Sequence, residues 1–262
     1  MPPLSPAPSR DSVVAALRAA GCVFAEDETE LILTTARTPD ELAAMVERRV
    51  AGLPLEHVLG WAEFHGLRVH VEAGVFVPRR RTEFLVDQAL ARAPHARVVV
   101  DLCCGSGAVG AALAAALGAV ELHAADIDPA AVRCAGRNVA GQGGHVYTGD
   151  LFEALPDRLR GRIDILAANV PYVPSDEVSL LPSEARDHEP LTALDGGADG
   201  LDVLRRVAAG APRWLAPSGV LLAETSARQA PTAVDAFTRA GLRTELAVSD
   251  ELYAHVVIGR TP

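Results

Sequence analysis

The residues best suited to chemistry begin with a glycine-rich stretch in the middle of the chain. Asp101 is followed by Leu-Cys-Cys, and then Gly105, Gly107 and Gly110 satisfy the pattern G-x-G-x-x-G. Between a strand and a helix, such a turn lets the backbone approach a nucleotide closely. Asp126 lies further along, where an acidic side chain can hold ribose hydroxyls. These residues predict a nucleoside site. In the alternative interpretation, the glycines only permit tight packing and Asp126 caps the next helix.

The first acidic residue of this stretch distinguishes between two nucleotide cofactors. A carboxylate at Asp101 would repel the pyrophosphate of a dinucleotide, whereas S-adenosylmethionine carries an ammonium and a sulfonium and no phosphate. We therefore expect Asp101 near the methionine end, Asp126 on the ribose, and Asp150 near the adenine, which would stack between Ile127 and Phe152. The residues expected to line this cofactor site are Asp101, Cys103, Gly105, Gly107, Asp126, Ile127, Asp150, Leu151, Phe152 and Asn169.

A second group of residues, the tetrapeptide Asn169-Val170-Pro171-Tyr172, follows an apolar run. The Asn169 side-chain oxygen and the Val170 carbonyl can accept hydrogen bonds, Pro171 stiffens the turn, and Tyr172 offers a flat face. Two acceptors and a flat wall suit a planar amino group, either an amide or a nucleobase amine. These four residues are the candidate catalytic residues. The alternative is a turn capped by the asparagine with a packed tyrosine.

Other chemistries find less support in the sequence. All 24 basic residues are arginine, so a Schiff-base lysine and a P-loop lysine are excluded. The four cysteines form no C-x-x-C pair and the histidines form no H-E-x-x-H motif, so we expect reduced thiols and no metal site.

Length and composition indicate one large globular domain with a small appendage. The chain has 262 residues, of which 49% are hydrophobic and 22% charged. A net charge of −10 makes the protein a poor generic binder of nucleic acid or anionic membranes. No run of 18 apolar residues occurs. We expect a cytoplasmic monomer without a membrane segment and without stable nucleic-acid binding.

The candidate residues need a scaffold, and the pattern from residue 97 onward supplies it. Short apolar runs alternate with helical stretches, which predicts an α/β fold with a doubly wound, mostly parallel sheet of seven strands. The last two strands must pair antiparallel because the connection Ser249–Leu252 is too short for a crossover. The expected strands span residues 97–102, 120–126, 145–148, 163–168, 219–224, 242–248 and 253–259.

Residues before this sheet have a different character. We expect a small helical domain over residues 1–57, with helices at 11–20 and 38–52 and little core of its own. A hairpin linker should span 58–78, with its turn at His65-Gly66, and the catalytic domain 79–262. The first domain has no nucleotide features, so we assign it to substrate docking.

These motifs together resemble the release-factor glutamine methyltransferase family, which methylates a glutamine side-chain nitrogen in a peptide-release motif. The resemblance covers about residues 40–260. It is carried by Pro54-Leu-Glu-His-Val-Leu-Gly60 with Ala62-Glu-Phe64, the stretch 101–110, Asp126, Gly149-Asp-Leu-Phe152, the stretch 169–172, and His188-Glu-Pro190 with the glycine-rich 194–201. It implies a class I methyltransferase fold, S-adenosyl-L-methionine as cofactor with S-adenosyl-L-homocysteine as product, no metal, and a release factor of translation termination as protein substrate.

The chain departs from the family pattern at three places. Val170 replaces the first proline of N-P-P-Y, but the backbone carbonyl survives. The family's P-R-P-E-T-E reads Pro78-Arg-Arg-Arg-Thr-Glu83, and the N-terminal helical part is shorter than usual. The run Arg79–Arg81 is either a contact for a polyanion or a cluster paired with neighbouring carboxylates.

Two other functions remain open from the sequence. The same site can hold an adenine or guanine amine, because an amide and an amino base present the same NH2 group. A non-catalytic homologue that only binds S-adenosylmethionine is the third possibility, although the intact Asp101, Asp126 and Asn169 oppose it.

Overall fold

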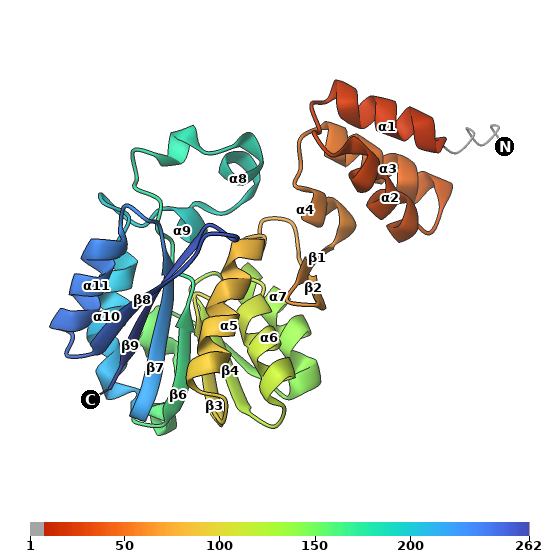
Figure 1. Ribbon diagram of the computed structural model, residues 1–262. Helices are drawn as coiled ribbons and strands as arrows, with labels where there is room; N and C mark the ends of the chain where they lie inside the picture. Colours follow the sequence, from red (N-terminus) through yellow and green to blue (C-terminus); the bar gives the residue numbers. More distant parts are fainter. Residues whose placement is uncertain (1–7, 262) are drawn as a thin grey trace.

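A computed structural model describes residues 8–261, and its centre is a twisted sheet (Figure 1). Within these residues the sheet has seven strands in the order β5-β4-β3-β6-β7-β9-β8. The five strands β5 to β7 are parallel, and β9 pairs antiparallel with both β7 and β8. The predicted fold is confirmed. The strands are β3 (Val98–Leu102), β4 (Glu121–Asp126), β5 (His145–Thr148), β6 (Ile163–Ala168), β7 (Leu215–Thr225), β8 (Arg243–Ser249) and β9 (Ala254–Arg260).

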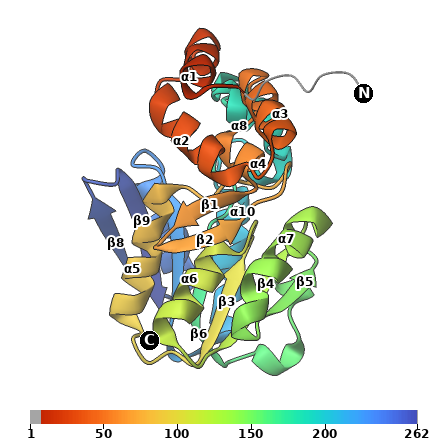
Figure 2. The ribbon, with the colours of Figure 1, turned by 90° about the vertical axis from the view of Figure 1, so that its right-hand side faces the viewer.

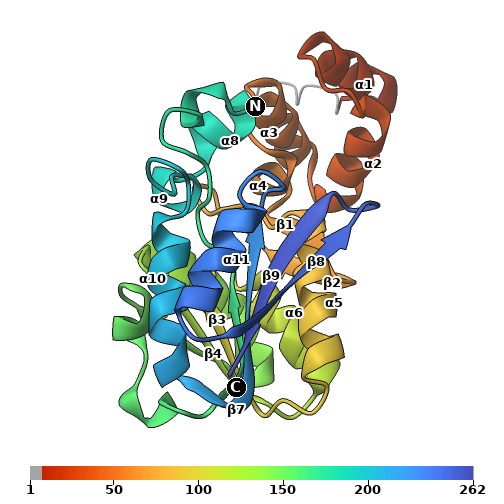
Figure 3. The ribbon, with the colours of Figure 1, turned by 60° about the vertical axis from the view of Figure 1, so that its left-hand side comes forward.

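Both faces of the sheet are covered, which explains why its central strands are apolar without alternation. In β3, Val98, Val100 and Leu102 contribute to one core, and Val99 contributes to the other. The first core is covered by α10 (Asp202–Gly210) and α11 (Ala230–Arg239). The second lies under α5 (Glu83–Arg92) and α6 (Ala108–Leu117), and α7 (Pro129–Val139) packs beside them on β4 and β5 (Figures 1 and 3).

The winding of the chain creates an opening between β3 and β6. From β3 the chain proceeds through α6 to β4 and then to β5 at one edge, and it returns to place β6 on the other side of β3. Two neighbouring strands whose connections run in opposite directions leave a crevice at their carboxyl ends. The candidate residues at the ends of β3, β4 and β6 therefore meet at one edge of the sheet.

The described residues before Gly60 form four helices: α1 (Arg10–Ala19), α2 (Ala25–Thr35), α3 (Pro39–Val50) and α4 (Leu55–Leu59). Thr38 caps α3 by accepting a hydrogen bond from the Glu41 N–H at 3.1 Å, as its position in the sequence predicts. The expectation of little core was wrong. Leu17, Ile32 and Met45, from three of the helices, join a separate buried cluster, because each helix presents an apolar stripe toward the others.

Two segments connect the helices to the sheet. The hairpin of β1 (Trp61–Phe64) and β2 (Leu67–His70) turns at His65-Gly66, as predicted. After β6, a long excursion carries α8 (Ser183–His188) and α9 (Leu191–Leu194) and brings α8 beside the N-terminal helices (Figures 2 and 3). Arg49 of α3 donates to Glu184 of α8 at 2.7 Å and so joins the two segments.

Some boundaries differ from the prediction. The strand expected over residues 219–224 already begins at Leu215 as β7, shortly after α10 ends at Gly210. A short 3-10 turn, Ala211–Arg213, with a proline in its first turn, separates them. The remaining 3-10 turns are Arg80–Thr82, Ala140–Gln142, Leu151–Ala154, Asp157–Leu159 and Val178–Leu180. Within residues 8–261, no helix combines the length and the apolar character that crossing a bilayer requires.

Candidate active site

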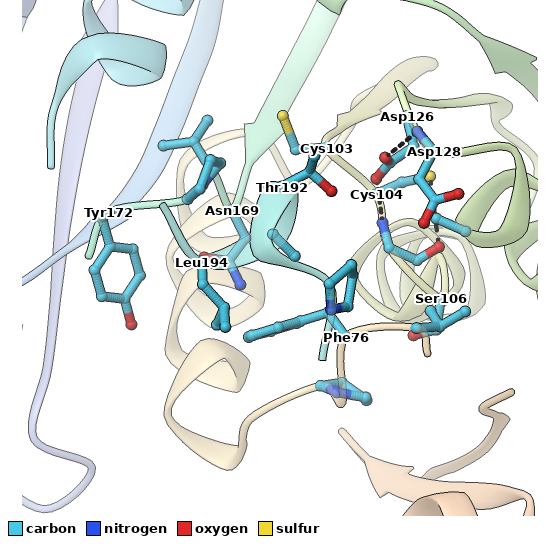
Figure 4. A pocket seen from close by; sticks show the side chains of 18 of the residues that line it. Phe76, Cys103, Cys104, Ser106, Asp126, Asp128, Asn169, Tyr172, Thr192 and Leu194 are labelled. Carbon is cyan, nitrogen blue, oxygen red and sulfur yellow. Dashed lines mark hydrogen bonds between the residues drawn. The ribbon is translucent and has the colours of Figure 1, made fainter. Parts of the chain in front are cut away.

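A cavity of about 560 Å³ lies at the carboxyl ends of β3, β4 and β6 (Figure 4). Its wall brings together most of the residues predicted from the sequence, although they come from four separate stretches of chain. The predicted residues that line it are Asp101, Cys103, Gly105, Asp126, Ile127, Asp150, Leu151, Asn169, Val170, Pro171 and Tyr172.

Asp101 ends β3 beneath the cavity and is almost fully buried. Its side chain accepts a hydrogen bond from the Gly110 N–H at 2.8 Å, and a Cβ at Gly110 would lie 3.2 Å from the same oxygen. The glycine thus permits the first turn of α6 to approach the carboxyl group. Burial raises the pKa of Asp101 to about 8. A cation in the cavity would favour the carboxylate form.

Asp126, at the end of β4, organises the glycine-rich turn. One carboxylate oxygen accepts from the Gly105 N–H and the other from the Asp128 N–H, both at 2.9 Å. Burial raises the pKa of Asp126 above its ordinary value. Asp128, rather than Asp126, caps α7 by accepting from the Ala130 N–H at 2.8 Å. The alternative reading of Asp126 as a helix cap was therefore wrong.

Two residues predicted to bind the cofactor, Gly107 and Phe152, are absent from the lining of the cavity. Gly107 begins α6 with a φ of +75°, and a Cβ there would come within 3.0 Å of Ala135, so this glycine serves packing against α7. Phe152 stacks on Trp214 with ring centres 5.6 Å apart, on the side of the sheet that α10 covers. Gly107 and Phe152 are not among the residues that line the cavity, and the stacking of Phe152 on adenine stays a prediction.

Asn169 follows β6 directly and forms part of the cavity wall. Its Oδ1 is enclosed by protein and has no hydrogen-bond partner in residues 8–261. An unpaired buried acceptor costs about 1–3 kcal/mol, so the side chain has an unused hydrogen-bonding capacity. The terminal torsion of an asparagine is broad, and rotation about the Cβ–Cγ bond can present either end of the amide to a ligand.

The loop after Asn169 is held by residues that the sequence did not single out. Gln229 of the turn before α11 is buried and donates from Nε2 to the Tyr172 carbonyl at 2.8 Å and to the Asp199 carbonyl at 2.9 Å. Gly200, with a φ of +75°, lies against the Tyr172 carbonyl, where a side chain would collide. The glycine-rich stretch 194–201 therefore packs on the backbone of the tetrapeptide. Val170, the departure from the family pattern, has a buried side chain in the core beside α10.

The arginine run is paired with carboxylates. Arg79 binds Glu189 at 2.6 Å, and Arg81 binds Glu224 at 2.9 Å. Both carboxylates have almost no exposed side chain, so each needs a positive partner. The alternative of pairing with neighbouring carboxylates thus holds for two of the three arginines. Glu224 was missed in the sequence, because a single acidic residue at the end of an apolar strand carries no local signal.

The cysteines near the cavity are not nucleophiles. Burial raises the pKa values of Cys103 and Cys104, so both thiols are neutral. All four cysteines are free thiols in the described part of the chain. Cys103 lines the cavity by its side chain and has a φ of +54°, a strained backbone angle at the point where β3 turns toward α6.

Comparison with known proteins agrees with this geometry. The Methyltransferase small domain matches residues 66–181. The "Release factor glutamine methyltransferase" of Geobacter sulfurreducens is 41% identical over 208 residues, which cover 78% of this chain and 72% of that protein. The chain belongs to the release factor glutamine methyltransferase family. The predicted membership is confirmed.

One relative is named for a different methyl acceptor. A protein of Streptomyces pristinaespiralis named "4-amino-L-phenylalanine/4-methylamino-L-phenylalanine methyltransferase" is 35% identical over 220 residues, 81% of this chain and 74% of that protein. Among solved structures, the hMettl16 catalytic domain in complex with an RNA hairpin aligns with a TM-score of 0.58 and 14% identity, over 85% of this chain and 80% of that chain. At this identity, the similarity shows the fold alone.

Proposed function

We propose that this protein transfers the methyl group of S-adenosylmethionine to the side-chain amide nitrogen of a glutamine in a peptide chain release factor. The observation that carries the proposal is the unpartnered Asn169 Oδ1 at a cavity whose floor is the buried Asp101. Membership in the family supports both the methyl donor and the substrate class.

The residues present fit the cofactor. Asp101 is a buried carboxyl group that accepts one hydrogen bond from the described part of the chain, and it is suited to an ammonium group. Asp126 uses both oxygens on backbone donors, and each carboxylate oxygen has a second lone pair for a ribose hydroxyl. We assign Asp150, Ile127 and Leu151 to the adenine end. When bound, S-adenosylmethionine supplies an electrophilic methyl group.

The role of the tetrapeptide follows from the chemistry of an amide. An amide nitrogen is a weak nucleophile because its lone pair is delocalised into the carbonyl. Asn169 Oδ1 and the Val170 carbonyl accept the two N–H bonds of the substrate amide and favour positive charge building on its nitrogen. Tyr172 fixes the plane of the amide, and Pro171 keeps the loop rigid. One amide proton leaves to water once the nitrogen carries the methyl group, because that nitrogen has become strongly acidic.

Burial keeps Tyr172 from acting as a base. Its enclosure, together with the neighbouring Glu224 carboxylate, raises the pKa of the phenol above its ordinary value. The tyrosine therefore remains neutral at physiological pH and serves as a wall and a hydrogen-bonding group. Positioning and electrostatics, rather than general base catalysis, are the contributions that this set of residues can make.

We also assign separate roles to three parts of the chain. Residues 1–57 dock the protein substrate, 58–78 form the hairpin linker, and 79–262 bind the cofactor and carry the reaction. The separate core of the N-terminal helices and their contact with α8, which borders the cavity through Glu184, support this division. We also propose that the protein works as a cytoplasmic monomer without stable nucleic-acid binding. The net charge of −10 supports the last of these points, because nucleic acid is also negatively charged.

The test is a methyl-transfer assay with labelled S-adenosylmethionine. Purified release factor, the same factor with its motif glutamine replaced by alanine, ribosomal protein and RNA are offered in parallel. We expect label in the intact release factor only, with mass spectrometry placing one methyl group on the glutamine side chain. Label in RNA, or equal label in the alanine variant, would refute the proposal.

A second candidate substrate is an aromatic amine of a free amino acid. The relative from Streptomyces pristinaespiralis is named for such a reaction, and an aryl NH2 group presents the same two N–H bonds to Asn169 and Val170. Adding 4-amino-L-phenylalanine to the same assay decides between the two: label in that compound with none in release factor favours the second candidate.

A further inference from the structure

Three side chains form a closed hydrogen-bonded triangle at the edge of the cavity. The Tyr172 hydroxyl donates to Glu224 Oε1 at 2.9 Å, and the Arg81 Nε donates to the same oxygen at 2.9 Å. A terminal nitrogen of Arg81 donates to the Tyr172 hydroxyl oxygen. Arg81 and Tyr172 both line the cavity, while the Glu224 side chain is only 2% exposed.

The triangle restricts the tyrosine ring. A phenol hydroxyl can donate one hydrogen bond and accept others. Here the Tyr172 hydroxyl donates to Glu224 and accepts from Arg81. With its far end held on both counts, the ring cannot swing about its Cα–Cβ bond without breaking two hydrogen bonds that involve charged groups. Thr82 completes the arrangement by donating to the second Glu224 oxygen at 2.6 Å.

Arg81 is the positively charged donor of the triangle. In the run Pro78-Arg-Arg-Arg-Thr-Glu83, the third arginine faces the buried Glu224. A carboxylate at position 81 would face Glu224 with a like charge and could not donate to Tyr172 when ionised. The arginine therefore supplies both a donor for the hydroxyl and a compensating charge.

We propose that Arg81 is a positioning residue for methyl transfer, which acts through the Tyr172 hydroxyl to hold the ring that forms the wall beside Asn169. This inference rests on the proposed function. Arg81 does not need to touch the substrate amide. Loss of Arg81 should slow the methyl-transfer step, because a mobile Tyr172 ring no longer fixes the plane of the substrate amide. Cofactor binding should not change, because the cofactor pocket stays intact.

A double-mutant cycle between Arg81→Met and Tyr172→Phe tests the proposal. We expect each single variant to lower kcat about tenfold, with KM values for cofactor and release factor within about twofold of wild type. The double variant should match the single ones, because both remove the same anchor. Arg92→Met, which breaks the distant ion pair with Glu245, is the control and should leave kcat unchanged.

Two outcomes of this cycle would overturn the proposal. Multiplying effects, about a hundredfold in the double variant, would mean that Arg81 acts independently of the hydroxyl. A raised KM for release factor at unchanged kcat would mean that Arg81 contacts the substrate protein. If the unpaired Glu224 prevents Arg81→Met from folding, the neutral pair Arg81→Met with Glu224→Gln takes its place in the same cycle.

A structural readout separates this proposal from the proposed function. In a crystal structure of the Arg81→Met variant, we expect the Tyr172 ring to leave its wild-type position or to occupy more than one. A ring that stays in place overturns the positioning role whether or not the enzyme is active. Wild-type protein that methylates no release factor refutes the proposed function, and the ring position still decides the role of Arg81.

Discussion

The buried charges of the N-terminal helices and two polar groups at the cavity, Asp101 and Asn169, differ in how completely the protein pairs them. In the helices, Arg49 is only 7% exposed and binds Glu28 at 2.6 Å and Glu184 at 2.7 Å, so charges are paired within the protein. At the cavity, among residues 8–261, one backbone N–H donates to Asp101 and no group pairs with Asn169 Oδ1. Unsatisfied polar groups are costly unless a ligand completes them. This difference supports the proposed docking role of the first region and the proposed ligand binding at the second.

The largest effect is expected when the buried ion pair between Arg49 and Glu28 is broken. Arg49→Met leaves Glu28 buried without its partner, which should destabilise the N-terminal helices by about 3 kcal/mol. Hydrogen exchange should show faster exchange in α1 to α4 and unchanged protection in the sheet. Arg37→Met, which breaks only the exposed pair with Glu41, is the matched control and should change little. Equal loss of protection throughout the chain would contradict an independent core.

The next effect concerns the unpartnered acceptor. Asn169→Ala should lower kcat about a hundredfold or more, since removing one preorganised polar group in a catalytic site costs about that much. Cofactor affinity, measured by calorimetry, should stay within a few-fold of wild type. Asn169→Asp keeps an acceptor but adds charge, and so tests the geometry more sharply. A wild-type rate in the alanine variant would mean that Asn169 is only a turn residue.

A smaller effect is expected at the ribose site. Asp126→Ala removes the acceptor for the Gly105 and Asp128 N–H groups as well as the proposed ribose hydrogen bonds. The affinity for S-adenosylmethionine should weaken by about 1.5–3 kcal/mol, as measured by calorimetry. Asp128→Ala, which removes the cap of α7, is the control that separates loop stability from ribose binding. Unchanged affinity in Asp126→Ala would remove this residue from the cofactor site.

The smallest effect is a pH dependence of cofactor affinity that arises from Asp101. In the free protein, burial raises the pKa of this carboxyl group to about 8, so it is neutral below that pH. A bound cation favours the carboxylate, which means that binding releases a proton. Affinity should therefore increase with pH up to about 8, by at most about tenfold per unit, and level off above.

Calorimetry in buffers of different ionisation enthalpy measures that proton release directly. Asp101→Asn keeps an oxygen acceptor for the Gly110 N–H but carries no charge. It should bind the cofactor more weakly, and without proton release from this site. Proton release that persists in the asparagine variant would assign the effect to another group.

Several features were predictable because their signals are local in the sequence. Apolar runs of the right length identified the strands of the sheet, and the short connection before Tyr253 fixed the antiparallel pair. The position of Asn169 directly after an apolar run indicated that it lies at the edge of the sheet, where it lines the cavity. The packing of Gly107 against Ala135 and of Phe152 against Trp214 was not predictable, because a motif gives positions along the chain but not which way each residue faces. The core of the N-terminal helices was underestimated, since α2 was not identified as a helix.

By itself, the sequence determined the sheet, the glycine-rich turn and the acidic and amide residues that end three strands, because strand periodicity and turn chemistry depend on neighbouring residues. Only the tertiary structure decided which buried charged and polar groups have partners. Arg81 meets Glu224 across 143 positions of sequence, whereas Asn169 Oδ1 meets no partner among the described residues. The pairing of long side chains depends on how distant elements pack, and no local pattern encodes that arrangement.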